Sequence, residues 1–172
     1  MLKKLLAIFG IILIDQLSKG YLLYLLTGRV PLGGRFYELV PFPVMFAEIT
    51  SFFNLVFTWN PGTSFSMLQS VGASAPLVII FATSAIIGYL GHRLIAKNPP
   101  RLESLALALI VGGAVANLVD RLRFGAVVDF LDFHIGGLHW PAFNFADICI
   151  SLGIAVFVYS LIKGQHHGKN IK

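Results

Sequence analysis

Long apolar segments alternate with polar, turn-rich segments along the chain, and this alternation predicts a membrane protein. The first segment is long enough to cross a hydrocarbon core of about 30 Å at about 1.5 Å per helical residue. The predicted spans are residues 5–26, 75–91, 102–119 and 145–162. We therefore expect a membrane α-helical fold with four transmembrane helices, in which residues 1–172 form a single integral membrane domain.

The stretch between the first two spans, residues 28–74, has a different character. Pro31, Pro41, Pro43 and the Gly33-Gly34 pair favour turns and extended chain over helix. Residues 49–60, ITSFFNLVFTWN, are rich in β-branched and aromatic side chains and are predicted as strand. The pattern indicates a small extracytoplasmic β-sheet cradle between spans one and two, with its aromatics in the interfacial belt.

Composition supports the membrane assignment and excludes a nucleic-acid partner. The chain is 56% hydrophobic and 12% charged, with a mean hydropathy of +0.80, whereas soluble domains average about 25% charged residues. Its net charge is +5, but the basic residues cluster at the edges of the apolar segments. The positive-inside rule explains that clustering better than nucleic-acid binding does.

The basic clusters also predict the orientation of the chain. Three clusters belong on the cytoplasmic side, which places both termini there and residues 28–74 and 121–144 on the opposite side. The clusters are Lys3 and Lys4; Arg93, Lys97 and Arg101; and Lys163, Lys169 and Lys172. Four arginines fall on the outer side and need acidic partners. They are Arg29, Arg35, Arg121 and Arg123, with Glu38, Glu48, Asp120 and Asp129 as candidates.

Acidic residues concentrate between Val111 and Asp147, where carboxylates close to a bilayer are costly and call for a reason. Asp129 and Asp147 lie at the ends of segments that should be neighbours, so the two carboxylates can converge at one depth. Such a pair shares a proton and supplies a general base and a general acid together. This chemistry suits aspartic peptide hydrolysis.

The residues alone leave other readings open. The acidic residues could pair structurally with arginines, or they could line a proton or ion pathway in a small transporter, although no internal repeat supports that reading. Asp120 rivals Asp129 for a place in the dyad, and Asp132 has no predicted role. Asp15 and Lys19 share a helix face at i,i+4 and either fix packing or face a polar cleft. The single cysteine, Cys149, and the scattered histidines match no metal spacing, so no metal or cofactor is expected.

Five motifs in order give the chain a specific resemblance to a known family. They are Asp15-Gln16-x-Ser18-Lys19; Asn60-x-Gly62 with Phe65-Ser66; Gly112-Gly113-Ala114 through Asn117-x-x-Asp120-Arg121; Val127-Val128-Asp129-Phe130; and Pro141-Ala142-Phe143-Asn144-x-Ala146-Asp147. The sequence resembles the lipoprotein signal peptidase (signal peptidase II) family over nearly its whole length. Thr63 and Ser64 depart from it, because the family commonly has two alanines there.

The resemblance implies an aspartic endopeptidase of the bacterial inner membrane, with its active site on the periplasmic side. Its substrates would be diacylglyceryl-modified prolipoproteins, cleaved just before the lipidated cysteine. Asp129 and Asp147 would be the catalytic dyad, with Asp120 holding Arg121. The other residues that would bind substrate or support the site are Asn60, Gly62, Asn117, Asn144, Asp15 and Lys19. The expected partners include membrane lipids and globomycin-type inhibitors, with the protein itself a monomer.

Overall fold

The structure is a computed structural model that describes residues 1–27, 44–62 and 75–169. The helices are α1 (Leu2–Thr27), α2 (Ala75–Ala96), α3 (Arg101–Phe124) and α4 (Phe145–Lys169). All four are long and apolar enough to cross a membrane, which confirms the predicted multi-pass fold. Helix α3 extends past its predicted end, so Arg121 and Arg123 lie on its last turn rather than in the segment that follows.

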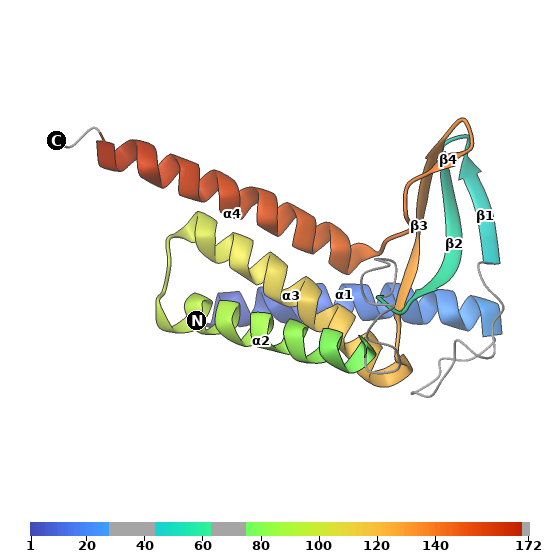
Figure 1. Ribbon diagram of the computed structural model, residues 1–172, viewed down its shortest axis with the longest axis horizontal. Helices are drawn as coiled ribbons and strands as arrows, with labels where there is room; N and C mark the ends of the chain where they lie inside the picture. Colours follow the sequence, from blue (N-terminus) through green and yellow to red (C-terminus); the bar gives the residue numbers. More distant parts are fainter. Residues whose placement is uncertain (28–43, 63–74, 170–172) are drawn as a thin grey trace.

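The helices alternate in direction, so the start of α1 and the end of α4 lie at one end of the molecule (Figure 1). The sheet stands at the opposite end, beyond the bundle (Figure 1). Helix α3 is the central element: 56% of its most apolar window is buried, against 6% for α2 and 17% for α4. The exposed apolar sides of α2 and α4 are the surfaces expected of helices that face lipid.

Small residues let α3 approach its neighbours closely, as the sequence predicts. A Cβ atom added to Gly113 would lie 2.5 Å from the backbone oxygen of Ala146 on α4. One added to Gly112 would lie 2.9 Å from the side chain of Ile11 on α1. The glycines therefore bring α1 and α4 against the same stretch of α3, and the candidate site lies beside that stretch.

The described residues form a four-stranded antiparallel sheet in the order β1-β2-β3-β4. The strands are β1 (Val44–Thr50), β2 (Phe53–Asn60), β3 (Val127–Ile135) and β4 (Leu138–His139). The predicted single strand over 49–60 is instead the end of β1, a turn at 51–52, and β2. Half of the sheet comes from the segment between α3 and α4, so the sheet is not confined to the region between spans one and two.

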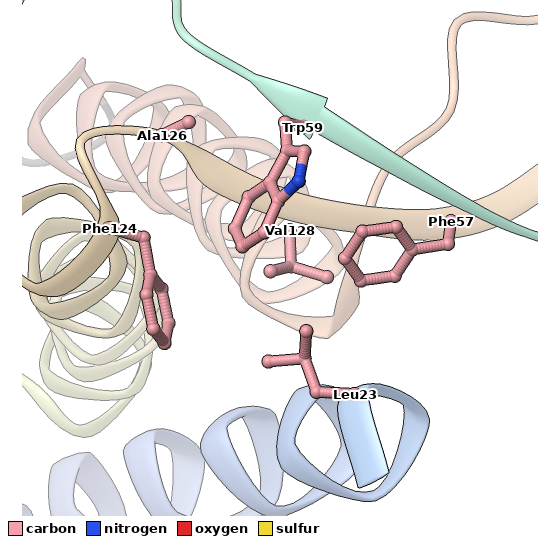
Figure 2. Close-up of a cluster of buried hydrophobic side chains, with 6 residues drawn as sticks. All are labelled: Leu23, Phe57, Trp59, Phe124, Ala126 and Val128. Carbon is pink, nitrogen blue, oxygen red and sulfur yellow. The ribbon is translucent and has the colours of Figure 1, made fainter. Parts of the chain in front are cut away.

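One face of this sheet packs on the helices through an apolar cluster. Phe57, Trp59 and Val128 point from β2 and β3 toward Leu23 on α1 and Phe124 at the end of α3 (Figure 2). Successive side chains on a strand point to opposite faces. Asn60 and Asp129, which directly follow Trp59 and Val128, therefore face the other side.

Candidate active site

Asp129 lies on β3 with its carboxylate held between two amides. The Nδ2 group of Asn144 donates to Oδ1 at 2.7 Å, and the Nδ2 group of Asn60 donates to Oδ2 at 3.0 Å. Asn60 is positioned by β2, where the neighbouring pair Thr58 and Asp129 sets the register with β3. Asn60 in turn accepts a hydrogen bond from the backbone N–H of Gly62, which has a φ of 80° that favours glycine.

The pKa of Asp129 is raised to about 7, first by burial and then by the charge of Asp147. The side chain is only 1% exposed, so its charged form loses most of its hydration. Hydrogen bonds from Asn60 and Asn144 lower the pKa but do not offset the burial. Near neutral pH, Asp129 can therefore both hold and release a proton.

Asp147 sits in the first turn of α4, where it forms a reciprocal cap with Asn144. The backbone N–H of Asp147 donates to Oδ1 of Asn144 at 3.0 Å, and the backbone N–H of Asn144 donates to Oδ2 of Asp147 at 3.2 Å. The helix N-terminus favours a negative charge at this position. Asn144 thus contacts both carboxylates, one through its side chain and the other through its backbone.

Asn117 on α3 holds the other oxygen of Asp147. Its Nδ2 group donates to Oδ1 of Asp147 at 2.8 Å. Its Oδ1 accepts from Lys19 at 3.1 Å and from Asn144 at 3.2 Å. With two donors at its oxygen, the amide can only present its nitrogen to Asp147.

Lys19 and Asp15 are buried in the helix bundle and support the site from behind. The Lys19 ammonium lies 2.7 Å from Oδ2 of Asp15 and 2.8 Å from Oδ2 of Asp120. Asp15 also accepts the backbone N–H of Ala146 on α4 at 2.9 Å. These contacts join α1, α3 and α4. They favour the prediction that Asp15 and Lys19 fix helix packing over the alternative that the pair faces a polar cleft.

Asp120 has different partners from those expected. Besides Lys19, it accepts from Nε2 of Gln16 at 2.8 Å and from the backbone N–H of Val128 at 3.3 Å. It therefore ties α1 to the start of β3, and no described hydrogen bond joins it to Arg121. The half-buried Arg121 lies beside Gly62, and its buried Nε has no hydrogen-bond partner within the described residues.

The remaining charge pairs expected from the sequence are only partly described. Arg123 donates to Oε1 of Gln16 at 2.9 Å and lies over the ring of Phe124. The other predictions fall outside the described residues. They concern Arg29, Arg35, Glu38, Phe65, Ser66 and the departures at Thr63 and Ser64.

Asp132, which has no role predicted from the sequence, belongs to a polar cluster three residues beyond Asp129 on β3. Nδ1 of His139 lies 2.9 Å from both of its oxygens, and Nδ2 of Asn54 donates to it at 3.0 Å. The sequence feature that could have predicted this cluster is the Gly136-Gly137 pair between β3 and β4, whose φ angles are 57° and 83°. Two glycines between strand-like runs predict a tight hairpin, and this hairpin brings His139 back toward Asp132.

Asp147 lines a cavity of about 470 Å³ on the side of α4, while Asp129 is buried behind it. The cavity walls are largely apolar and include Phe143, Ile148 and Leu152. Among the residues that the structure describes, no group of three or more His, Cys, Asp or Glu side chains is placed to hold a metal ion. The arrangement can polarise a water molecule and transfer protons with its two carboxyl groups alone.

The protein is an integral membrane protein with a multi-pass fold. Its candidate acid–base site holds two carboxyl groups, and Asn144 contacts both of them. The family model described as signal peptidase (SPase) II matches residues 7–163. The chain belongs to that family and is therefore a peptidase, a hydrolase embedded in the membrane. The family resemblance drawn from the sequence motifs is confirmed.

Curated relatives and solved structures agree with the family match. The chain is 46% identical over 116 residues to the lipoprotein signal peptidase of Janthinobacterium sp. (strain Marseille), covering 67% of this chain and 70% of the relative. It is 38% identical over 156 residues to that of Paraburkholderia phymatum, covering 89% and 83%. A solved bacterial membrane enzyme matches all of this chain and 93% of its own, with a TM-score of 0.74 and 24% identity. That likeness supports the fold.

Proposed function

We propose that this protein removes signal peptides from diacylglyceryl-modified prolipoproteins by an aspartic mechanism, cleaving just before the lipidated cysteine. Family membership supports the substrate class. The observation that carries the mechanism is that Asn144 binds both Asp129 and Asp147, which holds the two carboxyl groups in one site. The active site then lies on the periplasmic side of the bacterial inner membrane, with both termini cytoplasmic.

In the proposed mechanism the two carboxyl groups take different roles. Asp147, at the positive end of α4 and beside the cavity, is the ionised base that accepts a proton from water as the water attacks the peptide carbonyl. Asp129, with its raised pKa, is the protonated partner that hydrogen-bonds to the carbonyl oxygen and then transfers its one proton to the leaving nitrogen. The proton that Asp147 took from water then passes to Asp129, which restores both carboxyl groups.

The surroundings of the dyad suit a lipidated peptide. The cavity beside Asp147 is lined by apolar side chains that include Ile148 and Leu152 of α4, and it can accept apolar substrate groups. The buried Nε–H group of Arg121 has no hydrogen-bond partner among the described residues, and the guanidinium group, which lies beside Gly62, can donate to a carbonyl of the bound peptide. Lys19 is fully engaged with its buried partners, which assigns it to support. We further propose that the enzyme acts as a monomer among membrane lipids and that globomycin-type peptides occupy the same groove.

The proposed function is tested by comparing diacylglyceryl-modified and unmodified forms of one prolipoprotein. We expect the purified full-length protein to cleave the modified form, to act on the unmodified form at least about tenfold more slowly, and to be blocked by globomycin. A difference of that size corresponds to about 1.4 kcal/mol of discrimination. Cleavage of both forms at the same rate would contradict lipid recognition, and cleavage of neither would contradict the proposed function.

The pH dependence of cleavage follows from the protonation state of Asp129. Because its pKa is about 7 and the protonated form is required, kcat/KM should fall as the pH rises through about 7, approaching tenfold per pH unit. Asn60 donates to the charged form of Asp129, so Asn60→Ala should move this falling limb to higher pH. Measuring kcat/KM across the pH range with a single modified substrate checks both expectations.

Two outcomes of that pH series would contradict the role of Asp129. One is a falling limb that stays in place, or moves to lower pH, in Asn60→Ala. The other is a limb that disappears in His139→Gln, which would assign the falling limb to a group other than Asp129.

A further inference from the structure

A second cavity adjoins the one beside Asp147, and Trp140, Pro141 and Ala142 line both. It has a volume of about 490 Å³ and lies over β2 and the part of β3 that follows Asp129. Its lining combines three groups that can bind hydrogen-bond donors with an apolar rim formed by the chain after β4. The lining residues are Asn54, Val56, Thr58, Asp132, His139, Trp140, Pro141 and Ala142.

Asp132 supplies the charge of this cavity. Burial alone raises the pKa of Asp132, but hydrogen bonds from His139 and Asn54 outweigh that effect and hold its pKa below the usual value. Asp132 is 6% exposed, whereas the His139 side chain is 52% exposed. The cavity therefore has a buried, ionised carboxylate beside an exposed imidazole.

Asn54 adds an acceptor that the described residues leave unused. The residue is 6% exposed, and its Nδ2 is committed to Asp132 at 3.0 Å. That bond fixes the amide so that Oδ1 is its free atom, and Oδ1 is buried with no partner in the described part of the chain. Buried polar atoms almost always have a partner, so an unpaired oxygen on a residue that lines a cavity indicates a ligand that brings a donor.

The strand register connects this cavity to the candidate dyad. Thr58, which pairs with Asp129, and Asn54, which pairs with Asp132, both line the cavity, so the cavity extends along the sheet from the position of Asp129 to that of Asp132. Three residues along β3 correspond to about 10 Å at about 3.3 Å per residue. An extended peptide with its cleaved bond at Asp129 would therefore reach Asp132 about three residues farther along.

The direction of that peptide follows from the chemistry of its two halves. A signal peptide has an apolar central region, which belongs with the helices and the lipid. The released protein is polar and leaves the membrane, and the β4 end of the sheet points away from the bundle (Figure 1). The cavity over β2 and β3 thus suits the residues that follow the cleaved bond.

We propose that Asn54, Asp132 and His139 form a subsite for about the third residue after the cleaved bond, favouring cationic or hydrogen-bond-donating side chains over acidic ones. This inference rests on the proposed function. The subsite affects specificity and takes no part in the chemical step. An acidic residue at that position of the substrate would face the ionised Asp132, whereas a lysine or serine would supply the donor that Asn54 and Asp132 can accept.

The test uses synthetic diacylglyceryl-modified prolipoprotein peptides with lysine, serine or aspartate at the third residue of the released part. We expect the wild-type protein to cleave the lysine peptide with a kcat/KM about threefold to tenfold above that of the aspartate peptide, the range for a partly exposed charge pair. The same exchange at the eighth residue should change kcat/KM by less than about twofold, because it lies beyond the subsite.

Variants assign the preference to this cavity. Asp132→Asn should bring the lysine-to-aspartate ratio close to one, while Glu103→Gln, which removes an equal charge beside Arg93 at the far end of α3, should preserve it. A wild-type ratio near one, or equal ratios at the third and eighth positions, would overturn the subsite alone. Failure to cleave every modified peptide would overturn the proposed function and the subsite with it.

Discussion

Replacing either Asp129 or Asp147 with asparagine is expected to lower kcat/KM for a diacylglyceryl-modified prolipoprotein by about 10²- to 10⁴-fold, the range for loss of a general acid or base. Asparagine has nearly the same shape as aspartate but cannot exchange a proton. Asp147→Asn removes the group that accepts a proton from water, and Asp129→Asn removes the group that protonates the leaving nitrogen. Cleavage of a single substrate by purified variants measures both effects.

Both variants should still fold, because each substitution preserves most of the local contacts. An asparagine at position 129 keeps one acceptor for Asn144 or Asn60 and leaves one amide facing another. It also removes the cost of a buried charge, so the net change in stability should stay within about 2 kcal/mol. Glu103→Gln is the matched control, since Glu103 pairs with Arg93 at the opposite end of α3.

The double variant makes the test sharper. If the two carboxyl groups act as one unit, removing both should cost little more than removing one, since the remaining group has no partner to work with. Additive losses would indicate two independent roles. Normal cleavage by either single variant, at normal accumulation in the membrane, would contradict the dyad.

The sequence predicted the parts of this fold that depend on local chemistry. Span lengths follow from runs of apolar residues, and the close approach of α3 follows from Gly112 and Gly113, which the structure places against α1 and α4. The i,i+3 spacing of Asn144 and Asp147 predicted that an amide would lie near the acid, and these residues form the reciprocal cap of α4. In each case the type and spacing of nearby residues in the sequence were sufficient for the prediction.

Features that depend on strand register and tertiary contacts could not be predicted from local sequence spacing. Whether β3 would pair with β2 depends on two segments about 70 positions apart, joined by hydrogen bonds that any residues could make. The partner of Asp120 was misassigned for the same reason. Arg121 is adjacent in sequence, but the last turn of α3 directs the Asp120 carboxylate toward Lys19 and Gln16 on α1.

Replacing Lys19 with methionine is expected to destabilise the folded protein by about 3–5 kcal/mol, the cost of leaving buried charges unpaired. The Lys19 ammonium is the shared cation of Asp15 and Asp120, and the three side chains are 3%, 0% and 1% exposed. Without it, two buried carboxylates would face each other. The midpoint of thermal unfolding in detergent micelles, compared at one pH, measures the loss.

Lys4→Met is a matched control, because it makes the same change on the same helix. Lys4 donates to the backbone oxygen of Leu94 at 3.1 Å and to Oδ1 of Asn98 at 2.9 Å from a half-buried position. Its loss should cost only about 1 kcal/mol, as for an ordinary hydrogen bond. Equal destabilisation by the two variants would contradict a special role for the buried cation.

A triple variant that also neutralises Asp15 and Asp120 distinguishes the effect of the charge of Lys19 from the effect of its shape. Adding Asp15→Asn and Asp120→Asn to Lys19→Met removes both stranded charges while keeping acceptors for the backbone N–H groups of Ala146 and Val128. Much of the lost stability should return, because neutral groups need no buried cation. Cleavage should recover less, since Asn117 would lack the Lys19 donor that helps fix its amide toward Asp147. Stability and activity would then separate, as expected if Lys19 supports the fold and also orients the group that holds Asp147.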